Sequence, residues 1–476
     1  MIAFLTKHVV ASCFHVWFKT SMKGKRMKIS KLAGVLAALA LTTGSLVACA
    51  PAATVDPVAP TDEAAALTGE LLIWDTGILG KDASDDPYAD KAFLNQMGVE
   101  FEEANPGVTV TIVQQGGDIS SNAAAFQAAA IAGTGPDIRV QYAGGPTTSF
   151  ADFFEDLDPL LPKDMLDSMA GQYVNREGFS SDGRLLGMTY GAGNLFVVFQ
   201  NADVLKEAGI DPSVKPATWE ALVANAKQIS DKTDKNGFYT GNLEGYPGAW
   251  FISNMVGGEL GQTAFTDMYS GKIPVDDPAM LKAYQAFADW GKSGVNNPDA
   301  AQVTAGGQGF VAGEAGYYLV GSWENNGMTE AFGEDGPVTS FFIPTLEGAK
   351  FSKIGSGGPE IALSITSASK NKALAAEFLK FIARPEHQDR FVEIYQTQGS
   401  NHKDGDSSFI KNPRLKEQFE QLAQSTDGIT FAFDSVMPQA TIDLFYRVNA
   451  GVFSGAITPA DAVAQLKASY EQETGK

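Results

Sequence analysis

The sequence contains very little cysteine and histidine. Its 476 residues include two cysteines, Cys13 and Cys49, and four histidines, of which only His387 and His402 follow residue 49. The chain beyond Cys49 therefore offers no thiol for a disulfide, a zinc–thiolate site or a cysteine nucleophile. Two histidines are also too few for a zinc-delivery protein. We expect neither a metal nor a cofactor.

Positive charge is scarce as well. The formal net charge is −21, and the first 49 residues carry seven basic side chains and no acidic ones, which leaves −28 on the remainder. So acidic a body lacks the phosphate-neutralising surface that a nucleic-acid partner requires. Motifs of zinc proteases, serine hydrolases and phosphate-binding loops are absent from the sequence. A calcium loop aligned on Gly237 would place Lys232 and Leu243 at its first and twelfth positions, and therefore fails.

The first 49 residues have the pattern of an export signal. Basic residues are concentrated in 23–31, and an apolar run over 32–47 follows, too short to span a membrane comfortably. The run ends in Leu46-Val47-Ala48-Cys49, which resembles the bacterial lipobox, whose cysteine is diacylated and becomes the new N-terminus. Two acyl chains give stable membrane anchoring. We predict a signal peptide over 1–49, complete from Met27 onward, and lipidation of Cys49; a plain secretory signal is the alternative.

The rest of the chain divides into a tether and a large body. Residues 50–68 are rich in Ala, Pro, Thr and acidic side chains and lack apolar periodicity, so we predict a flexible tether. The body is too long for one ordinary core, and two lobes or more are expected. Strand and helix patterns alternate in it, which indicates an α/β sheet covered by helices. They are a strand over 70–74, a helix with Phe93, Met97, Phe101 and Ala104 on one face, a strand over 108–112, an Ala-rich helix over 123–132 and a strand over 137–142.

Helical patterns continue in the second half of the chain. They comprise an N-cap at Thr218 before the stripe Leu222, Ala226 and Ile229, a face formed by Leu281, Tyr284, Phe287 and Trp290, and an N-cap at Thr458 before Val463, Leu466 and Tyr470. We expect Trp219 and Trp290 to pack in the core. Tyr317-Tyr318 resembles an iron-binding tyrosine pair, but its place inside an apolar strand favours packing.

Six segments of the body carry a family pattern. In chain order they are Phe101–Gly107, Gly133–Asp137, Gly187–Gly209, Pro216–Glu220, Phe310–Trp323 and Ser367–Phe381. In this order, and behind a lipobox, they resemble the extracellular solute-binding proteins of the family that includes maltose-binding protein. The resemblance extends over about residues 69–476.

The resemblance implies an α/β, two-lobe periplasmic-binding-protein-like fold of type II, whose lobes are joined by crossing hinge strands. Lobe one is predicted over 69–190 and 354–392, lobe two over 191–353 and 393–476, and the crossings near 190–201, 351–358 and 392–400. The ligand would lie in the cleft and touch both lobes only when they close, so that it shifts the equilibrium toward the closed form.

Candidate ligand contacts follow from the chemistry of a sugar, which needs flat rings for its apolar faces and polar groups for its hydroxyls. The family positions select four aromatic side chains: Trp323 after the strand at 317–320, Trp250 in a loop-like stretch before a Gly-Gly pair, Tyr142 past a strand, and Trp74 at the end of the first strand. The polar candidates are Asp75, Thr76, Gln114, Gln115, Asn194, Glu324, Asn325, Gly358 and Glu360.

The resemblance therefore implies a substrate-binding lipoprotein of an ABC importer. It would be a monomer attached to the outer face of a bacterial membrane through Cys49, and would hand a carbohydrate to the permease subunits without catalysis. A binding protein for iron, a polyamine or glycerol phosphate and a sugar-sensing subunit are alternatives. Because carboxylates are abundant, their number does not decide against a paired-acid glycosidase either.

Overall fold

The computed structural model describes residues 66–81, 89–117 and 119–476. All of them belong to one structural unit. The predicted signal peptide, Cys49 and the tether up to residue 65 lie outside the described residues. The first strand begins at Thr68, the last residue assigned to the tether.

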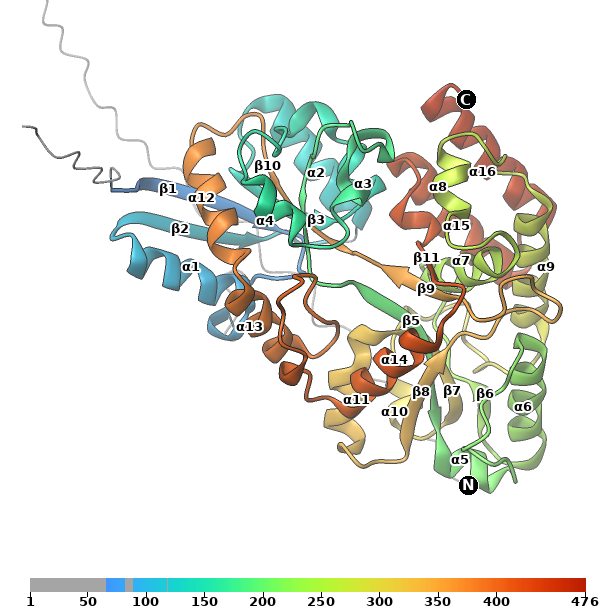
Figure 1. Cartoon of the computed structure of the whole chain (residues 1–476). Coiled ribbons are helices and arrows are strands. Elements are labelled where there is room, and N and C mark those ends of the chain that lie inside the picture. Colours follow the sequence, from blue (N-terminus) through green and yellow to red (C-terminus); the bar gives the residue numbers. More distant parts are fainter. Residues whose placement is uncertain (1–65, 82–88, 118) are drawn as a thin grey trace, which may run out of the picture. The chain divides into compact units, whose positions relative to one another are not determined.

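The first lobe is built on a five-stranded sheet of order β2-β1-β3-β10-β4 (Figure 1). Its strands are β1 (Thr68–Asp75), β2 (Gly107–Gln114), β3 (Ile138–Tyr142), β4 (Met188–Tyr190) and β10 (Ile361–Ile365). β1 pairs in parallel with β2 and β3, whereas β10 runs antiparallel between β3 and β4. Alternation along β1 turns Leu71 and Ile73 into the core, as the period of a strand requires.

Helices cover both faces of this sheet. They are α1 (Phe93–Ala104), α2 (Ile119–Ala132), α3 (Gly145–Thr148), α4 (Lys163–Asp167), α12 (Lys372–Ile382) and α13 (Pro385–Tyr395), with short 3-10 turns η1 (Ala89–Lys91), η2 (Ala151–Phe153), η3 (Gln172–Asn175), η4 (Glu177–Phe179) and η6 (Ser407–Phe409). α1 and α12 share a core in which Phe101 packs edge-on against Phe378. α2 lies on the opposite face, where Phe126 stacks on Phe154.

The second lobe is built on a sheet of order β11-β9-β5-β7-β6, with β8 also paired to β5. Its strands are β5 (Asn194–Asn201), β6 (Asn236–Phe238), β7 (Ala315–Gly321), β8 (Val338–Phe342), β9 (Gly355–Gly358) and β11 (Ile429–Thr430). Every residue of β5 and β7 is buried, because other strands flank each of them and helices cover their faces.

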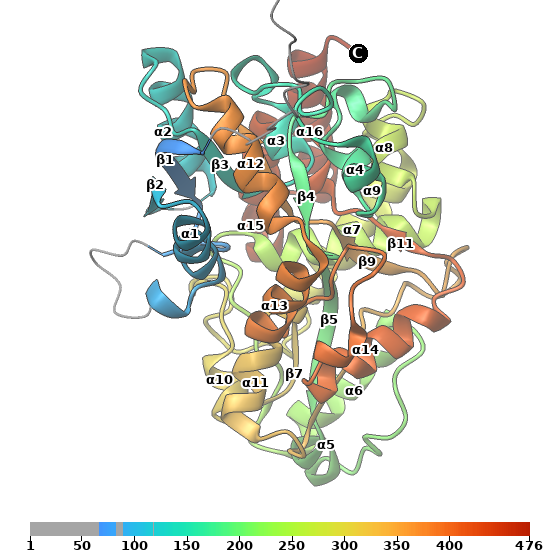
Figure 2. The same cartoon turned by 60° about the vertical axis from the view of Figure 1, so that its left-hand side comes forward.

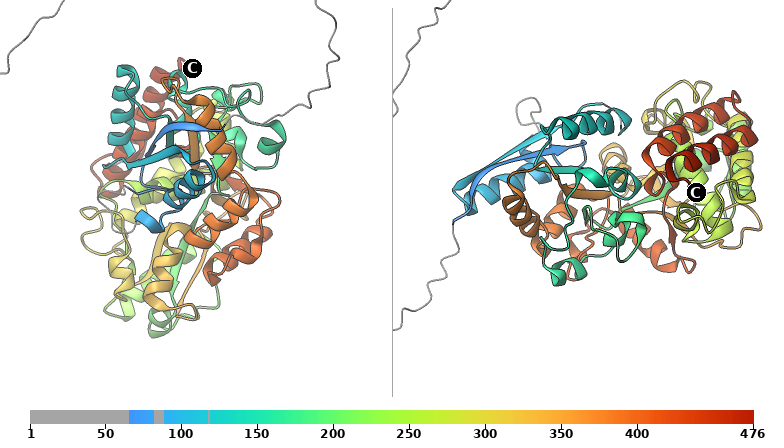
Figure 3. Two further views of the ribbon diagram at one scale, coloured as in Figure 1. Left: turned by 90° about the vertical axis from the view of Figure 1, so that its left-hand side faces the viewer. Right: turned by 90° about the horizontal axis from the view of Figure 1, so that it is seen from above.

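Ten helices and two 3-10 turns complete the described part of this lobe. They are α5 (Ala202–Glu207), α6 (Trp219–Lys232), α7 (Tyr246–Leu260), α8 (Ala264–Tyr269), α9 (Pro278–Lys292), α10 (Gln308–Val311), α11 (Asn325–Phe332), α14 (Pro413–Gln424), α15 (Gln439–Ser454), α16 (Pro459–Thr474), η5 (Ser322–Glu324) and η7 (Phe433–Ser435). Figure 3 shows α15 and α16 side by side. Trp219 and Trp290 meet edge-on in the core beneath α6 and α9, which confirms that both are packing residues.

The chain changes sheet at the predicted crossings, with shifts. It passes from β4 to β5 across 191–193 and from β9 to β10 across 359–360 (Figure 2). β9 therefore belongs to the second sheet, although residues from 354 onward were expected in lobe one. The last crossing also comes later than 392–400, because Ala170 N–H donates to Asn401 O and Lys403 N–H donates to Ser168 O, both in the first lobe.

Local sequence rules account for the start of several helices. The Thr218 hydroxyl accepts a hydrogen bond from Ala221 N–H at 3.2 Å, and the Thr458 hydroxyl accepts one from Asp461 N–H at 3.1 Å, so both predicted caps are confirmed. The predicted face of α9 is wrong at Leu281, which is 44% exposed. Leu281 and Trp290 are separated by about two and a half helical turns and therefore lie on opposite sides of the helix.

Trp250 lies in a helix and not in the loop predicted for it. α7 begins after Gly245, whose φ is +86°, and Pro247 occupies its first turn. The Gly-Gly pair that suggested a loop stays helical because α7 packs closely. A Cβ at Gly257 would lie 2.4 Å from the Thr430 side chain.

Candidate functional site

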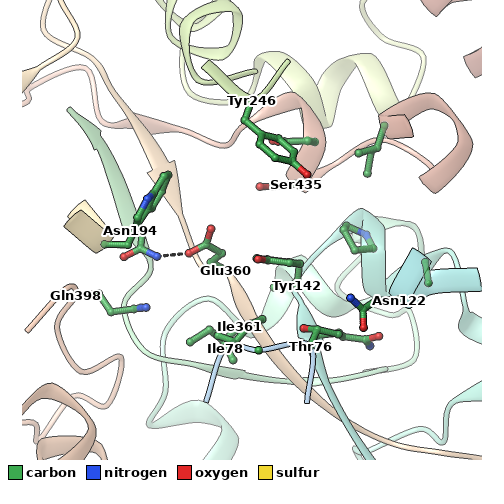
Figure 4. A pocket seen from close by; sticks show the side chains of 18 of the residues that line it. Thr76, Ile78, Asn122, Tyr142, Asn194, Tyr246, Glu360, Ile361, Gln398 and Ser435 are labelled. Carbon is green, nitrogen blue, oxygen red and sulfur yellow. Dashed lines mark hydrogen bonds between the residues drawn. The ribbon is translucent and has the colours of Figure 1, made fainter. Parts of the chain in front are cut away.

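A cavity of about 590 Å³ is lined by residues from both lobes. The first lobe contributes Thr76, Gly77, Ile78, Asn122, Arg139, Gln141, Tyr142, Glu360, Ile361 and Gln398, and the second contributes Asn194, Phe196, Tyr246, Trp250, Trp323, Asp434, Ser435 and Tyr446, among others (Figure 4). Because both lobes contribute, a ligand seated here would be held from two sides.

Three aromatic rings form one wall of the cavity. Trp250 on α7 and Trp323 after β7 meet with ring centroids 5.1 Å apart and planes at 64°, and Phe196 of β5 lies 6.1–6.2 Å from both. Gly321 makes this arrangement possible, since a Cβ there would lie 1.9 Å from the Trp323 ring. Both indoles are only half-buried, so they present ring surface to a ligand.

Beside the rings lies a polar pair. The Asn194 side-chain amide donates to the Glu360 carboxylate, and the Ser322 hydroxyl donates to Asn194 Oδ1 at 3.0 Å. Burial raises the pKa of Glu360 to about 7, although the bond from Asn194 opposes this rise. Glu360 thus has a carboxylate oxygen facing the cavity that can accept hydrogen bonds from a ligand.

Tyrosines and a second carboxylate occupy the middle of the cavity. Tyr446 OH donates to Asp434 Oδ2 at 2.9 Å, and the rings of Tyr246 and Tyr446 meet edge-on at 4.9 Å. Burial raises the pKa of Asp434 to about 6 and raises the pKa of the Tyr142 hydroxyl well above its ordinary value. Tyr142 and Tyr246 both point into the space next to Glu360 (Figure 4).

The loop after β1 is fixed by Asp75. Its carboxylate accepts hydrogen bonds from Gly77 N–H and Ile78 N–H, both at 2.6 Å, and from Leu79 N–H at 3.0 Å. Burial nevertheless raises its pKa to about 6. Asp75 is fully buried beneath the loop, and its function in this structure is to hold the residues after it against the cavity.

The far end of the cavity, next to α2, is formed by β3. Arg139 and Gln141 alternate with the core residues Ile138 and Val140, so their side chains point toward α2. The Arg139 guanidinium carbon lies 4.1 Å from the centre of the Phe126 ring. Burial lowers the pKa of Arg139 to about 9.

With this geometry established, comparison with known proteins identifies the family. Residues 96–416, more than half of the chain, match the family model described as bacterial extracellular solute-binding protein. The chain belongs to this family. Curated relatives include the sn-glycerol-3-phosphate-binding periplasmic protein UgpB of Yersinia pseudotuberculosis, 26% identical over 241 residues, which are 47% of this chain and 50% of that protein. The chain thus spans about half the length of the curated relatives it matches.

Solved structures show the same fold. A protein from work on xylan utilization by Caldanaerobius polysaccharolyticus matches with a TM-score of 0.70 at 21% identity, covering 84% of this chain and 99% of that one. A chitin oligosaccharide binding protein matches with 0.73 at 19% identity, covering 86% and 100%. The GacH receptor of Streptomyces glaucescens, solved without ligand and with acarbose, matches with 0.67 at 20% identity, covering 86% and 99%. The two-lobe fold expected from the sequence is therefore confirmed.

Six of the thirteen candidate residues of this solute-binding protein come together in the cavity. They are Thr76, Tyr142, Asn194, Trp250, Trp323 and Glu360. These residues come from separate parts of the chain, and the two sheet changes bring them to one place.

The other seven lie outside the cavity lining: Trp74, Asp75, Gln114, Gln115, Glu324, Asn325 and Gly358. Trp74 packs against the cluster around Phe126. Gln115 donates its backbone N–H to Asp75 O at 2.7 Å. Gly358 has φ +123° and pairs with Asn194, so it shapes the crossing. Glu324 follows Trp323 in η5, and partial burial raises its pKa.

Sequence reasoning missed most of the lining residues, among them Arg139, Phe196, Tyr246, Asp434 and Tyr446. One of them had a readable pattern, because Arg139 is a charged residue inside the apolar strand Ile138–Tyr142. Tyr446 looks like an ordinary member of a helix stripe, and Asp434 like a residue of a surface turn. Their roles depend on how α15 and η7 meet the first lobe.

Among the described residues, no helix is both long and apolar enough to cross a membrane. In the same part of the chain, no three His, Cys, Asp or Glu side chains are grouped closely enough to hold a metal ion.

Proposed function

We propose that this protein captures a carbohydrate in the cavity between its lobes and delivers it to an ABC importer. The observation that carries the proposal is the corner formed by Trp250 and Trp323 beside the hydrogen-bonded pair Asn194 and Glu360. Rings suit the apolar faces of a sugar, and the amide and carboxylate suit its hydroxyls. Two of the structural neighbours are described with a chitin oligosaccharide and with acarbose, which supports this ligand class.

Binding would work through closure of the two lobes. Trp250, Trp323 and Asn194 belong to the second lobe, whereas Glu360 and Tyr142 stand at the edge of the first. A ligand that contacts both sets gains contacts only when the lobes are together, and this difference shifts the equilibrium toward the closed form. The permease would then recognise the closed form.

Attachment to the membrane through Cys49 is part of the proposal and rests on the lipobox pattern. Expression of the full chain and its Cys49→Ser variant in a bacterial host tests it. The wild-type protein should fractionate with membranes and incorporate labelled palmitate, and the variant should do neither. Equal amounts of both proteins in the soluble extracytoplasmic fraction would refute lipidation.

Binding of a phosphorylated glycerol is the second candidate. It is supported by the similarity to a sn-glycerol-3-phosphate-binding protein over 47% of the chain. A thermal-shift screen that includes glycerol 3-phosphate together with mono- and oligosaccharides decides between a carbohydrate and a phosphorylated glycerol as the ligand.

We further propose that the protein has no hydrolytic activity. Glu360 and Asp434 both face the cavity, and a pair of carboxylates is the apparatus of a glycosidase. Each carboxylate already accepts a hydrogen bond from a neutral donor, Glu360 from the Asn194 amide and Asp434 from the Tyr446 hydroxyl. Incubation with oligosaccharides, followed by measurement of new reducing ends, should show none. Formation of reducing ends that is lost in Glu360→Gln would establish an enzyme instead.

A thermal-shift screen tests the ligand class, because a ligand that binds the folded protein raises its melting temperature. At least one sugar should raise Tm of the wild-type protein. Trp323→Ala should abolish this rise and change the Tm of the unliganded protein less than loss of a core ring would, since the Trp323 ring is only half-buried. Trp219→Ala is the control: this core ring is 4% exposed, and its loss should destabilise the fold by about 3–5 kcal/mol. If Trp323→Ala lowers the Tm of the unliganded protein as much as Trp219→Ala does, the Trp323 ring belongs to the core.

A further inference from the structure

Arg139 is a buried cation with no counter-ion among the described residues. It is 4% exposed, and no acidic side chain of the described residues forms an ion pair with it. In the part of the chain that the structure describes, its Nη1 group has no hydrogen-bond partner. Asp75, at the end of the neighbouring strand β1, is occupied by three backbone N–H groups and does not neutralise it.

Arg139 lines the cavity, and the side chains packed against its guanidinium are aromatic rings. The rings of Phe126 and Phe150 lie 4.1 Å and 5.1 Å from the guanidinium carbon and interact with it through their faces. A ring face satisfies the charge in part but accepts none of the five N–H groups of a guanidinium in regular geometry. Two nearby lining residues also have buried polar atoms with no partner within residues 66–81, 89–117 and 119–476: the acceptor Gln141 Oε1 and the hydroxyl oxygen Thr76 Oγ1.

A second buried arginine, Arg414, shows the hydrogen bonds that a guanidinium with a structural role forms in this fold. Arg414 on α14 is 3% exposed, about as buried as Arg139. Its guanidinium donates to Val338 O at 3.1 Å, Thr329 Oγ1 at 2.9 Å and Gly333 O at 2.9 Å. Buried charges are normally paired or hydrogen-bonded, because their desolvation is otherwise uncompensated. Arg139 departs from this rule, and it does so in the wall of the ligand cavity.

We propose that the end of the cavity at Arg139 binds an oxyanion group of the ligand, a carboxylate or a phosphate carried by a hydroxylated molecule. The inference rests on the proposed function and narrows its ligand class to acidic sugars or sugar phosphates. A planar guanidinium presents paired donors that match the oxygen atoms of either group. The Thr76 hydroxyl can donate a further hydrogen bond to the oxyanion, whereas Gln141 Oε1 can accept one from a neighbouring hydroxyl of the ligand, because Gln141 Nε2 already donates to Ser364 Oγ at 3.1 Å.

The other charges of the cavity fix the direction in which such a ligand lies. Figure 4 places Thr76 and Asn122 on the far side of Tyr142 from the Asn194–Glu360 pair. Asn122 is one helical turn before Phe126, the ring against Arg139, so the arginine belongs to this far end. Glu360 and Asp434 would repel an anionic group elsewhere in the cavity. The neutral sugar ring would therefore lie on the indoles, and the acidic group at Arg139.

The test compares neutral and acidic partners of the same sugar. Glucose, glucuronate and glucose 6-phosphate, the galactose series and glycerol 3-phosphate are titrated into the full protein and into Arg139→Gln by calorimetry, with Tm of the unliganded proteins measured in parallel. We expect at least one acidic compound to bind at least about tenfold more tightly than its neutral partner. Arg139→Gln should remove this preference by lowering the affinity for the acidic partner at least about tenfold. The carboxylate and phosphate arms show which oxyanion is preferred.

The unliganded protein separates a binding role from a structural one. Arg139→Gln should keep or raise Tm, because it removes an uncompensated buried charge. Arg414→Gln is the matched control and should lower Tm, since its three acceptors lose their donor. A comparable fall for Arg139→Gln, or equal binding of neutral and acidic sugars by the wild type, would overturn the proposal. Binding of glycerol 3-phosphate alone would sink the carbohydrate assignment but uphold the anion site, and binding of no compound would remove both.

Discussion

Replacing Glu360 by glutamine should stabilise the unliganded protein at high pH and have little effect at low pH. Burial raises the pKa of Glu360 from its ordinary 4.5 to about 7. In the unfolded chain this group loses its proton near pH 4.5, whereas in the folded protein it keeps it up to about pH 7. The folded state therefore binds more protons in this window, and the free energy of unfolding falls as pH rises through it.

The size of the effect follows from the pKa difference. At ~1.4 kcal/mol per pKa unit, wild-type stability should decrease by about 3 kcal/mol between pH 4 and pH 8 from this group. Glutamine cannot ionise, and its side-chain oxygen can still accept the hydrogen bond from the Asn194 amide. Glu360→Gln should therefore be about 3 kcal/mol more stable than wild type at pH 8 and about equal at pH 4.

Denaturant unfolding of both proteins at pH 4 and pH 8 measures this difference in stability. The free energies are compared from the unfolding midpoints, with the same slope of free energy against denaturant concentration used for both proteins. Glu334→Gln, on an exposed loop, is the control for the loss of one negative charge. The reasoning is refuted if Glu360→Gln is less stable than wild type at pH 8, or if its stability differs from wild type by the same amount at both pH values.

Two glycines allow further predictions about the cavity. Gly145→Ala adds a Cβ 2.1 Å from Met437 O, which should hold α3 of the first lobe away from the segment before α15. Sugar binding should therefore weaken by at least about tenfold. Gly116→Ala is the control and should bind normally, because the space around Gly116 is open. Gly321→Ala adds a Cβ 1.9 Å from the Trp323 ring, and should lower the calorimetric affinity by displacing the indole without removing it. Neither glycine has a positive φ, so an unfolded variant would contradict the steric explanation.

Local patterns predicted most of the fold because they depend on neighbours in the chain. The caps at Thr218 and Thr458 and the apolar face of α1 require only short-range geometry. The errors occur where tertiary packing decides. The Gly-Gly pair of α7 looks like a loop until Thr430 is known to fill the space of a side chain. Crossing positions shifted for the same reason, since backbone pairing with segments far along the chain holds residues near Asn401 in the first lobe.

The site was predictable where the family order fixes a residue at a crossing or strand end. Asn194 and Glu360 are of this kind, as is Trp323. Asp75 occupies the expected place, but its side chain turns inward to accept backbone N–H groups, and sequence does not show which way a loop carboxylate turns. Tyr446 and Asp434 enter the cavity only because α15 and η7 approach the first lobe closely. A Cβ at Gly144 would lie 1.9 Å from Ser435 O.

The raised pKa of Glu360 also predicts how protons move when the ligand binds. In the unliganded cavity, one side-chain amide stabilises the carboxylate, and desolvation dominates. A sugar hydroxyl that donates to the free oxygen favours the ionised form and lowers the pKa of Glu360. Binding near pH 6.5 should therefore release protons, and the calorimetric enthalpy should vary with the ionisation enthalpy of the buffer in the direction of release. Glu360→Gln should remove this dependence. Net proton uptake by the wild type would mean that the ligand places its acidic group beside Glu360. That result would contradict the role of Glu360 as an acceptor for a sugar hydroxyl, and it would contradict the orientation in which the acidic group lies at Arg139.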